Sequence, residues 1–203
     1  MLEEARRYGF LGPGPVQAHL DHASGFGEVM QCTLGPGQGT GGRAADLGSG
    51  AGVPGLPLAL RFITWSWVLV DSSARRAGFL RDAIRTLGME GRVRVVQERA
   101  EVVGRSLEYR GSFDLVVARS FGPPAVAAEC AAPLLGTEGW AVVSEPPGGN
   151  PNRWPAEGLA RVGMVPDAAI VAQGWAYQLL RQAELCSERY PRRTGVPTKR
   201  PLF

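Results

Sequence analysis

Short apolar runs alternate with amphipathic stretches along most of the chain after residue 42. The apolar runs predict strands at Ala44–Leu47, Ser66–Val70, Val93–Val96, Phe113–Ala118 and Trp140–Ser144, then a hairpin of Ala168–Ala172 and Tyr177–Ala183. The stretches between them predict helices at Val53–Leu60, Ala74–Leu87, Pro123–Leu134 and Trp154–Arg161. Strands that alternate with helices predict an α/β protein with a mostly parallel sheet, and the hairpin adds an antiparallel C-terminal edge.

The two ends of the chain depart from this alternation. Residues 1–42 predict a short helical extension, with helices at Leu2–Tyr8 and Val16–Cys32 followed by a flexible glycine-rich linker over residues 35–42. Residues 188–203 are proline-rich and basic, and they predict an extended tail. The chain is therefore expected to have three parts: the extension and linker, a main domain over residues 43–187, and the tail.

The amino-acid composition indicates a globular protein without a membrane span or a metal site. The 203 residues are 44% hydrophobic and 20% charged, which is typical of a soluble globular protein. No apolar run is long enough to span a membrane, and the first residues lack the apolar core of a signal peptide, so we expect a cytoplasmic location. The three cysteines lie far apart without metal-ligand spacing, so no metal site is expected. The net charge of +3, carried mostly by arginine, permits contact with nucleic acid without demonstrating it.

A glycine-rich turn carries the strongest chemical signal. Gly48, Gly50 and Gly52 alternate between a predicted strand and a predicted helix, and Val53 follows them. Glycine allows the sharp turn and lets a ligand lie against the backbone. The spacing GxGxG differs from the GxGxxG of dinucleotide-binding turns. Asp46, two residues before the first glycine, suits a ligand that bears an ammonium group, such as the methionine moiety of S-adenosylmethionine (SAM).

Further candidates follow the next predicted strands. Asp71 ends the second strand, where an acid can accept hydrogen bonds from both ribose hydroxyls, and Ser72 comes directly after it. Ala100 and Glu101 follow the third strand, where backbone N–H groups can meet an adenine ring or the segment can simply face water. Arg119 follows the fourth strand, where substrate and methyl donor would meet, although a solvated strand-end arginine is an equally ordinary interpretation. A SAM site explains these residues better than an NAD site does.

Several of these segments resemble one family. DLGSGAGVPGLPLAL, VDSSARRAGFL, ERAE, VARS and the tail YPRRTGVPTKRPL are similar to RsmG (GidB) proteins, bacterial methyltransferases of guanine N7 in small-subunit ribosomal RNA. The resemblance implies a Rossmann-like class I SAM-dependent methyltransferase fold, SAM as cofactor, and ribosomal RNA or the small ribosomal subunit as partner. It implies Gly48 and Val53 beside methionine, Ala100 and Glu101 beside adenine, Arg119 at the methyl-transfer site, and Arg192, Arg193, Lys199 and Arg200 facing RNA.

The chain departs from the family pattern at three places. The N-terminal region is short and lacks an Asn-Leu-Thr motif. After the fifth strand, where the family has Lys-Gly, the chain reads Ser144-Glu145-Pro146-Pro147, so a negative charge replaces a positive one. Ser120 stands where the family has Ala. A negative charge near an RNA site should weaken binding. These departures keep two alternatives open: a small-molecule methyltransferase and a catalytically silent SAM-binding paralogue. Guanine N7 has no proton to remove, so the chemistry needs positioning more than acid–base help. This agrees with the expectation that His19 and His22, both near the start, are not placed for catalysis.

Overall fold

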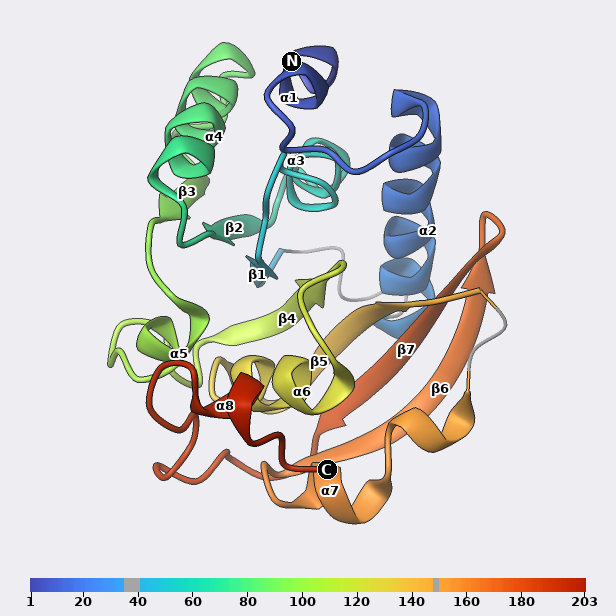
Figure 1. Ribbon diagram of the computed structural model, residues 1–203, viewed down its shortest axis with the longest axis vertical. Coiled ribbons are helices and arrows are strands. Elements are labelled where there is room, and N and C mark those ends of the chain that lie inside the picture. The colour runs from blue at the N-terminus through green and yellow to red at the C-terminus, as the bar shows by residue number, and fades with distance from the viewer. Residues whose placement is uncertain (35–40, 148–149) are drawn as a thin grey trace.

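The computed structural model describes residues 1–34, 41–147 and 150–203, and its centre is one seven-stranded sheet (Figure 1). The strand order is β3-β2-β1-β4-β5-β7-β6. The first five strands pair in parallel, and β7 pairs antiparallel with both β5 and β6. The strands are β1 (Arg43–Leu47), β2 (Ser66–Val70), β3 (Val93–Val96), β4 (Phe113–Ala118), β5 (Leu135–Glu145), β6 (Met164–Ala172) and β7 (Trp175–Gln182). This confirms the expected α/β class with its antiparallel edge.

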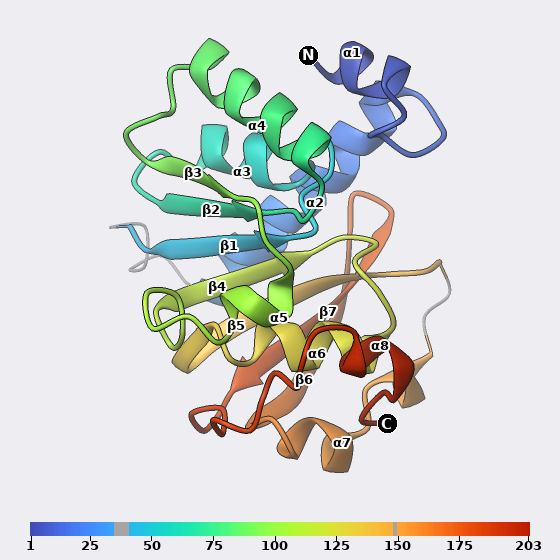
Figure 2. The same cartoon turned by 60° about the vertical axis from the view of Figure 1, so that its left-hand side comes forward.

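Helices cover both faces of the sheet (Figures 1 and 2). They are α1 (Leu2–Arg7), α2 (Val16–Leu34), α3 (Gly55–Arg61), α4 (Ala74–Thr86), α5 (Ala100–Val103), α6 (Pro124–Ala131), α7 (Ala156–Ala160) and α8 (Val196–Lys199), with a 3-10 turn at Pro151–Arg153. Alternate residues of each strand enter opposite cores, as the pleat requires. In β2, Trp67 and Leu69 pack with α3 and α4, whereas Val68 and Val70 pack with α6.

The N-terminal region is packed against the sheet. Phe26, Val29 and Met30 of α2 are fully buried in the same core as residues of α3, β6 and β7. The hydroxyl of Tyr177 donates to the backbone oxygen of His22 at 2.7 Å, which joins β7 to α2. Residues 35–40 of the expected linker lie outside the described residues. None of the helices in the described ranges is long and apolar enough to cross a membrane.

The tail corrects one expectation, because it is not simply extended. It contains α8, and its apolar residues Tyr190 and Leu202 are buried in the core on the α6 side. The fully buried carboxylate of Glu129 in α6 accepts hydrogen bonds from the backbone N–H and the guanidinium of Arg192, at 2.6–2.8 Å. Apolar burial and this ion pair hold the tail on the domain, and neither can be recognised from a basic, proline-rich composition.

Candidate active site

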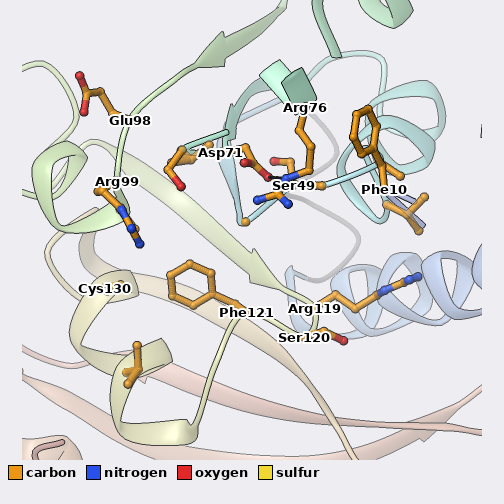
Figure 3. A pocket seen from close by; sticks show the side chains of 18 of the residues that line it. Phe10, Ser49, Asp71, Arg76, Glu98, Arg99, Arg119, Ser120, Phe121 and Cys130 are labelled. Atoms are coloured by element: carbon orange, nitrogen blue, oxygen red, sulfur yellow. Dashed lines mark hydrogen bonds and ion pairs between the residues drawn. The ribbon is translucent and has the colours of Figure 1, made fainter. Parts of the chain in front are cut away.

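A pocket of about 430 Å³ opens at the carboxyl ends of β1, β2 and β4 (Figure 3). The connection from β3 to β4 takes the chain from one half of the sheet to the other, so the switch point lies between the neighbouring strands β1 and β4. Ligands of open α/β sheets bind at such a point. The volume suits a nucleoside-sized ligand. The structure brings most of the predicted site residues together in its wall: Gly48, Gly50, Val53, Asp71, Ser72, Ala100, Glu101 and Arg119.

The glycine turn is fixed to the sheet by its backbone. The N–H groups of Gly48 and Ser49 both donate to the carbonyl of Val70, at 2.9 and 3.0 Å. Gly48 and Gly50 have φ angles of +69° and +57°, which favour glycine. A Cβ atom on Gly48 would stand 2.8 Å from the ring of Phe121, so the absence of a side chain allows this close approach.

Asp71 sits at the floor of the pocket with its carboxylate held from several sides (Figure 3). Its Oδ2 accepts hydrogen bonds from the Gly50 N–H and from Arg76 Nε, both at 2.9 Å. Its Oδ1 accepts from the Ser73 N–H at 2.8 Å. The acid is therefore fixed against the glycine turn, and a carboxylate with about four acceptor positions retains capacity on Oδ1 for a ligand hydroxyl.

Two predicted residues, Asp46 and Gly52, lie behind the wall instead of in it. Asp46 is buried, its Oδ2 accepts from the Gly55 N–H at 3.1 Å, and its Oδ1 has no hydrogen-bond partner among the described residues. Burial raises the pKa of Asp46 to about 7. A Cβ on Gly52 would collide with Leu56, so this glycine permits packing of the turn on α3. Neither residue lines the pocket, and their contact with the cofactor stays a prediction.

The third-strand segment meets the tail at the far side of the pocket. Glu101 is nearly buried, and its Oε1 accepts a hydrogen bond from the Gly195 N–H at 2.8 Å. Thr198 of α8 belongs to the pocket wall. The alternative of a fully solvated Glu101 is therefore wrong, because the tail covers it.

Arg119 contacts a histidine that the sequence analysis set aside. Its Nη2 lies 2.8 Å from Nδ1 of His19, and Figure 3 shows its side chain turned toward α2. Its Nη1 is buried without a hydrogen-bond partner among the described residues. Burial lowers the pKa of Arg119, and nearby Asp46 and Tyr177 oppose that shift. Folding brings α2 across the end of β4, so His19 reaches a predicted site residue from a distant part of the sequence.

Glu145 does not present its charge to the pocket, contrary to the expectation. Its side chain is 7% exposed and forms an ion pair with Arg153 Nε at 2.7 Å. Trp154 Nε1 also donates to it at 3.1 Å. The negative charge that replaces the family lysine is thus compensated locally by a residue eight positions downstream in the sequence.

Several wall residues were missed by the sequence analysis. Phe10, Leu11 and Gly12 come from the turn between α1 and α2, and Arg76, Phe121 and Thr198 come from α4, the segment after β4, and α8. The VDSSARR and YPRRTGVPTKRPL segments, already noted for the resemblance, contained two of them. Nothing in the local sequence marks Phe10 or Phe121. No group of acidic, histidine and cysteine side chains suited to a metal ion occurs in the described residues.

Solved structures define the class of fold. A protein described as a sarcosine dimethylglycine methyltransferase from Galdieria sulphuraria superposes with a TM-score of 0.60 at 12% identity, covering 80% of this chain and 85% of that one. A protein described as a methyltransferase, yhhF from Escherichia coli, gives 0.57 at 20% identity over 77% and 85%. The [4+2]-cyclase SpnF gives 0.56 at 16% identity over 76% and 80%. The fold is therefore that of class I methyltransferases, and SpnF shows that it also hosts other chemistry.

Sequence comparisons identify the particular family. The model of GidB, described as rRNA small subunit methyltransferase G, matches residues 31–144. Ribosomal RNA small subunit methyltransferase G from Rubrobacter xylanophilus is 38% identical over 79% of this chain and 65% of its own length. That from Lactobacillus helveticus is 32% identical over 87% and 73%. The chain belongs to the GidB family, although it spans slightly less than two thirds of the Rubrobacter protein.

Proposed function

We propose that this protein is a SAM-dependent methyltransferase that transfers a methyl group to guanine N7 in small-subunit ribosomal RNA. The observation that carries the proposal is the convergence of the glycine turn, Asp71 and Arg119 on one pocket at the switch point of the sheet. Membership of the GidB family, whose members are named ribosomal RNA small subunit methyltransferases, supports ribosomal RNA as the acceptor, and the sequence resemblance described above suggests guanine N7 within it.

The residues present fit SAM. Gly48 and Gly50 leave backbone open to a ligand, and Asp71 offers an acceptor where a ribose would lie. Asp46 lies buried behind the turn, and in its ionised form its carboxylate adds negative potential suited to an ammonium group. Ala100 and the apolar ring of Phe121 border the space left for the adenine end.

The proposed reaction requires the protein mainly to position the methyl donor and the acceptor base. SAM, when bound, supplies an electrophilic methyl group next to its sulfonium. Guanine N7 has a lone pair and no proton to lose, so the acceptor would need no general base from the protein. The chain therefore has to exclude water and align the acceptor, and Arg119 is a cationic wall residue suited to fix an acceptor oxygen.

The small-molecule alternative loses its main support in the structure. It rested on the negative charge of Glu145 and on the short N-terminal region. Glu145 is paired with Arg153, and α2 packs on the sheet and brings His19 to Arg119. Neither feature makes the pocket unsuited to RNA.

Methyl transfer from labelled SAM to purified small ribosomal subunits tests the proposal. We expect label in 7-methylguanosine after digestion, and no label when the glycine turn is blocked by Gly50→Val. Label in a different nucleoside would support methyl transfer to RNA but reject guanine N7 as the acceptor atom. No label in RNA, together with label in a metabolite extract, would reject the RNA substrate.

A further inference from the structure

His19 and Arg119 form a directional hydrogen-bond chain beside the pocket. A guanidinium can only donate, so Nδ1 of His19 must accept the hydrogen bond from Arg119 at 2.8 Å. That leaves the proton on Nε2, which lies 3.2 Å from the carbonyl of Gly12 and donates to it. The tautomer of His19 is thereby fixed from both sides, and Gly12 is itself a residue of the pocket wall.

These two hydrogen bonds of His19 determine the direction of the Arg119 guanidinium. Arg119 follows β4 directly, and Ser120 after it adopts a φ of +52°, an uncommon value for a residue with a side chain. Nη2 is committed to His19, whereas Nη1 is buried without a hydrogen-bond partner among the described residues. A buried donor without a partner is costly, so it is expected to meet an acceptor when the site is filled. Without the bond to His19, a long arginine side chain would be able to adopt several rotamers.

We propose that His19 is the positioning residue of Arg119, and that the proposed methyl transfer requires His19 in its neutral form. The inference rests on the proposed function for its kinetic part only. A protonated imidazole would have donors on both nitrogens, and it would place two positive charges at hydrogen-bond distance. Arg119 would then lose its anchor and turn away.

The surroundings of the pair favour the neutral imidazole. Burial, and then the charge of Arg119, lower the pKa of His19 from its ordinary value of 6.5. The titratable groups that face the pair are His22 on α2, Asp46 on β1 and Tyr177 on β7. His22 has a pKa of about 4 and Asp46 one of about 7, so a pH profile contains an Asp46 contribution that must be separated from that of His19.

The kinetic test compares three variants on the same helix. We expect His19→Ala to lower kcat about tenfold or more, since a hydrogen bond to a charged group is lost, with the Kd for SAM changed less than about threefold. His19→Asn keeps an acceptor oxygen at the place of Nδ1, so it should restore most of the rate. Gln17→Ala, at an exposed α2 position, is the matched control and should match the wild type.

The pH dependence of kcat distinguishes a positioning role of His19 from a purely structural one, because a purely structural role would not change the pH profile. The wild type should lose activity as pH falls through the lowered pKa of His19, whereas His19→Asn, which does not titrate there, should lack this limb and keep only that of Asp46. His19→Ala as active as Gln17→Ala, or an unchanged acid limb in His19→Asn, would overturn the proposal.

A spectroscopic test is independent of activity. The chain has only two histidines, so nitrogen NMR of the labelled protein resolves His19 with His22 as internal reference. We expect the Nε2–H tautomer of His19, with a pKa below 6.5 that rises in Arg119→Gln because the neighbouring cation is gone. A mixture of tautomers, or a pKa that Arg119→Gln does not move, would overturn the proposal. If the wild type transferred no methyl group, the proposed function would be rejected. The NMR measurement would still test the contact between His19 and Arg119.

Discussion

At the scale of single residues, Gly50 shows how the pocket depends on a missing side chain. Its φ is +57°, its N–H holds Asp71, and it lines the pocket. We expect Gly50→Val to weaken SAM binding at least a hundredfold in calorimetry, because the side chain would enter the pocket and strain the turn.

Gly88 supplies the matched control for this prediction. It also has a positive φ, +65°, but a Cβ there would meet nothing within 4 Å. Gly88→Val should therefore carry a similar backbone cost of about 1–2 kcal/mol and leave SAM binding unchanged. Equal loss of binding in both variants would mean that general destabilisation explains the effect.

Asp46 makes a prediction about stability. Its pKa in the folded protein is about 7, raised by burial from the ordinary 3.8. Between these values the folded state binds more protons than the unfolded state, so stability falls as pH rises from about 4 to 7, and the cost is complete above 7. The free energy of unfolding of Asp46→Asn relative to the wild type should increase over this window by on the order of 2–4 kcal/mol.

Denaturant titrations of both proteins at pH 4.5 and pH 8 check this, since a constant offset from the substitution cancels in the comparison. A difference that is the same at both pH values would show that Asp46 titrates normally in the folded protein.

At the scale of elements, the tail acts as a wall of the pocket. Arg192 neutralises the buried Glu129 of α6, Gly195 donates to Glu101 of α5, and Thr198 faces the ligand space. Removing one partner of a buried pair leaves an uncompensated charge. We expect Arg192→Ala to lower stability by about 3 kcal/mol in thermal unfolding and to weaken SAM binding.

Two further variants test whether the effect of Arg192→Ala comes from its ion pair with Glu129. Adding Glu129→Gln to Arg192→Ala should recover part of the stability, because the buried charge disappears with its partner. Arg193→Ala, at an exposed position next in the sequence, should leave the melting temperature unchanged. Arg192→Ala without any loss of stability would contradict the structural role of the pair.

At the scale of the whole molecule, we propose that the remaining tail cations contact RNA beside the pocket. Arg193, Lys199 and Arg200 are exposed, and the net charge of the chain is +3. Replacing each by alanine should weaken binding to small-subunit RNA and reduce the slope of log affinity against log salt by about 1 per charge that contacts phosphate. Arg85→Ala, on the exposed face of α4, is the control for loss of one charge. Equal slopes for all four variants would remove the tail from the RNA interface.

The sequence by itself determined the order of strands along the chain and the chemistry of the turn. The bounds of β2, β3 and β4 are those expected, because a short apolar run rich in β-branched residues and bounded by polar or turn residues is a local signal of a strand. The glycine turn, Asp71 and Ala100 were recognisable because each follows such a strand, and parallel strands bring their carboxyl ends to one edge.

Only the tertiary structure decided which distant side chains meet. His19 reaches Arg119 across 100 positions, Arg192 neutralises Glu129 across 63, and Glu145 is compensated by Arg153 instead of facing the pocket. It also placed Asp46 and Gly52 behind the pocket wall. Local patterns report periodicity and backbone preference, whereas the pairing of side chains depends on how helices and tail pack on the sheet, which no single segment encodes.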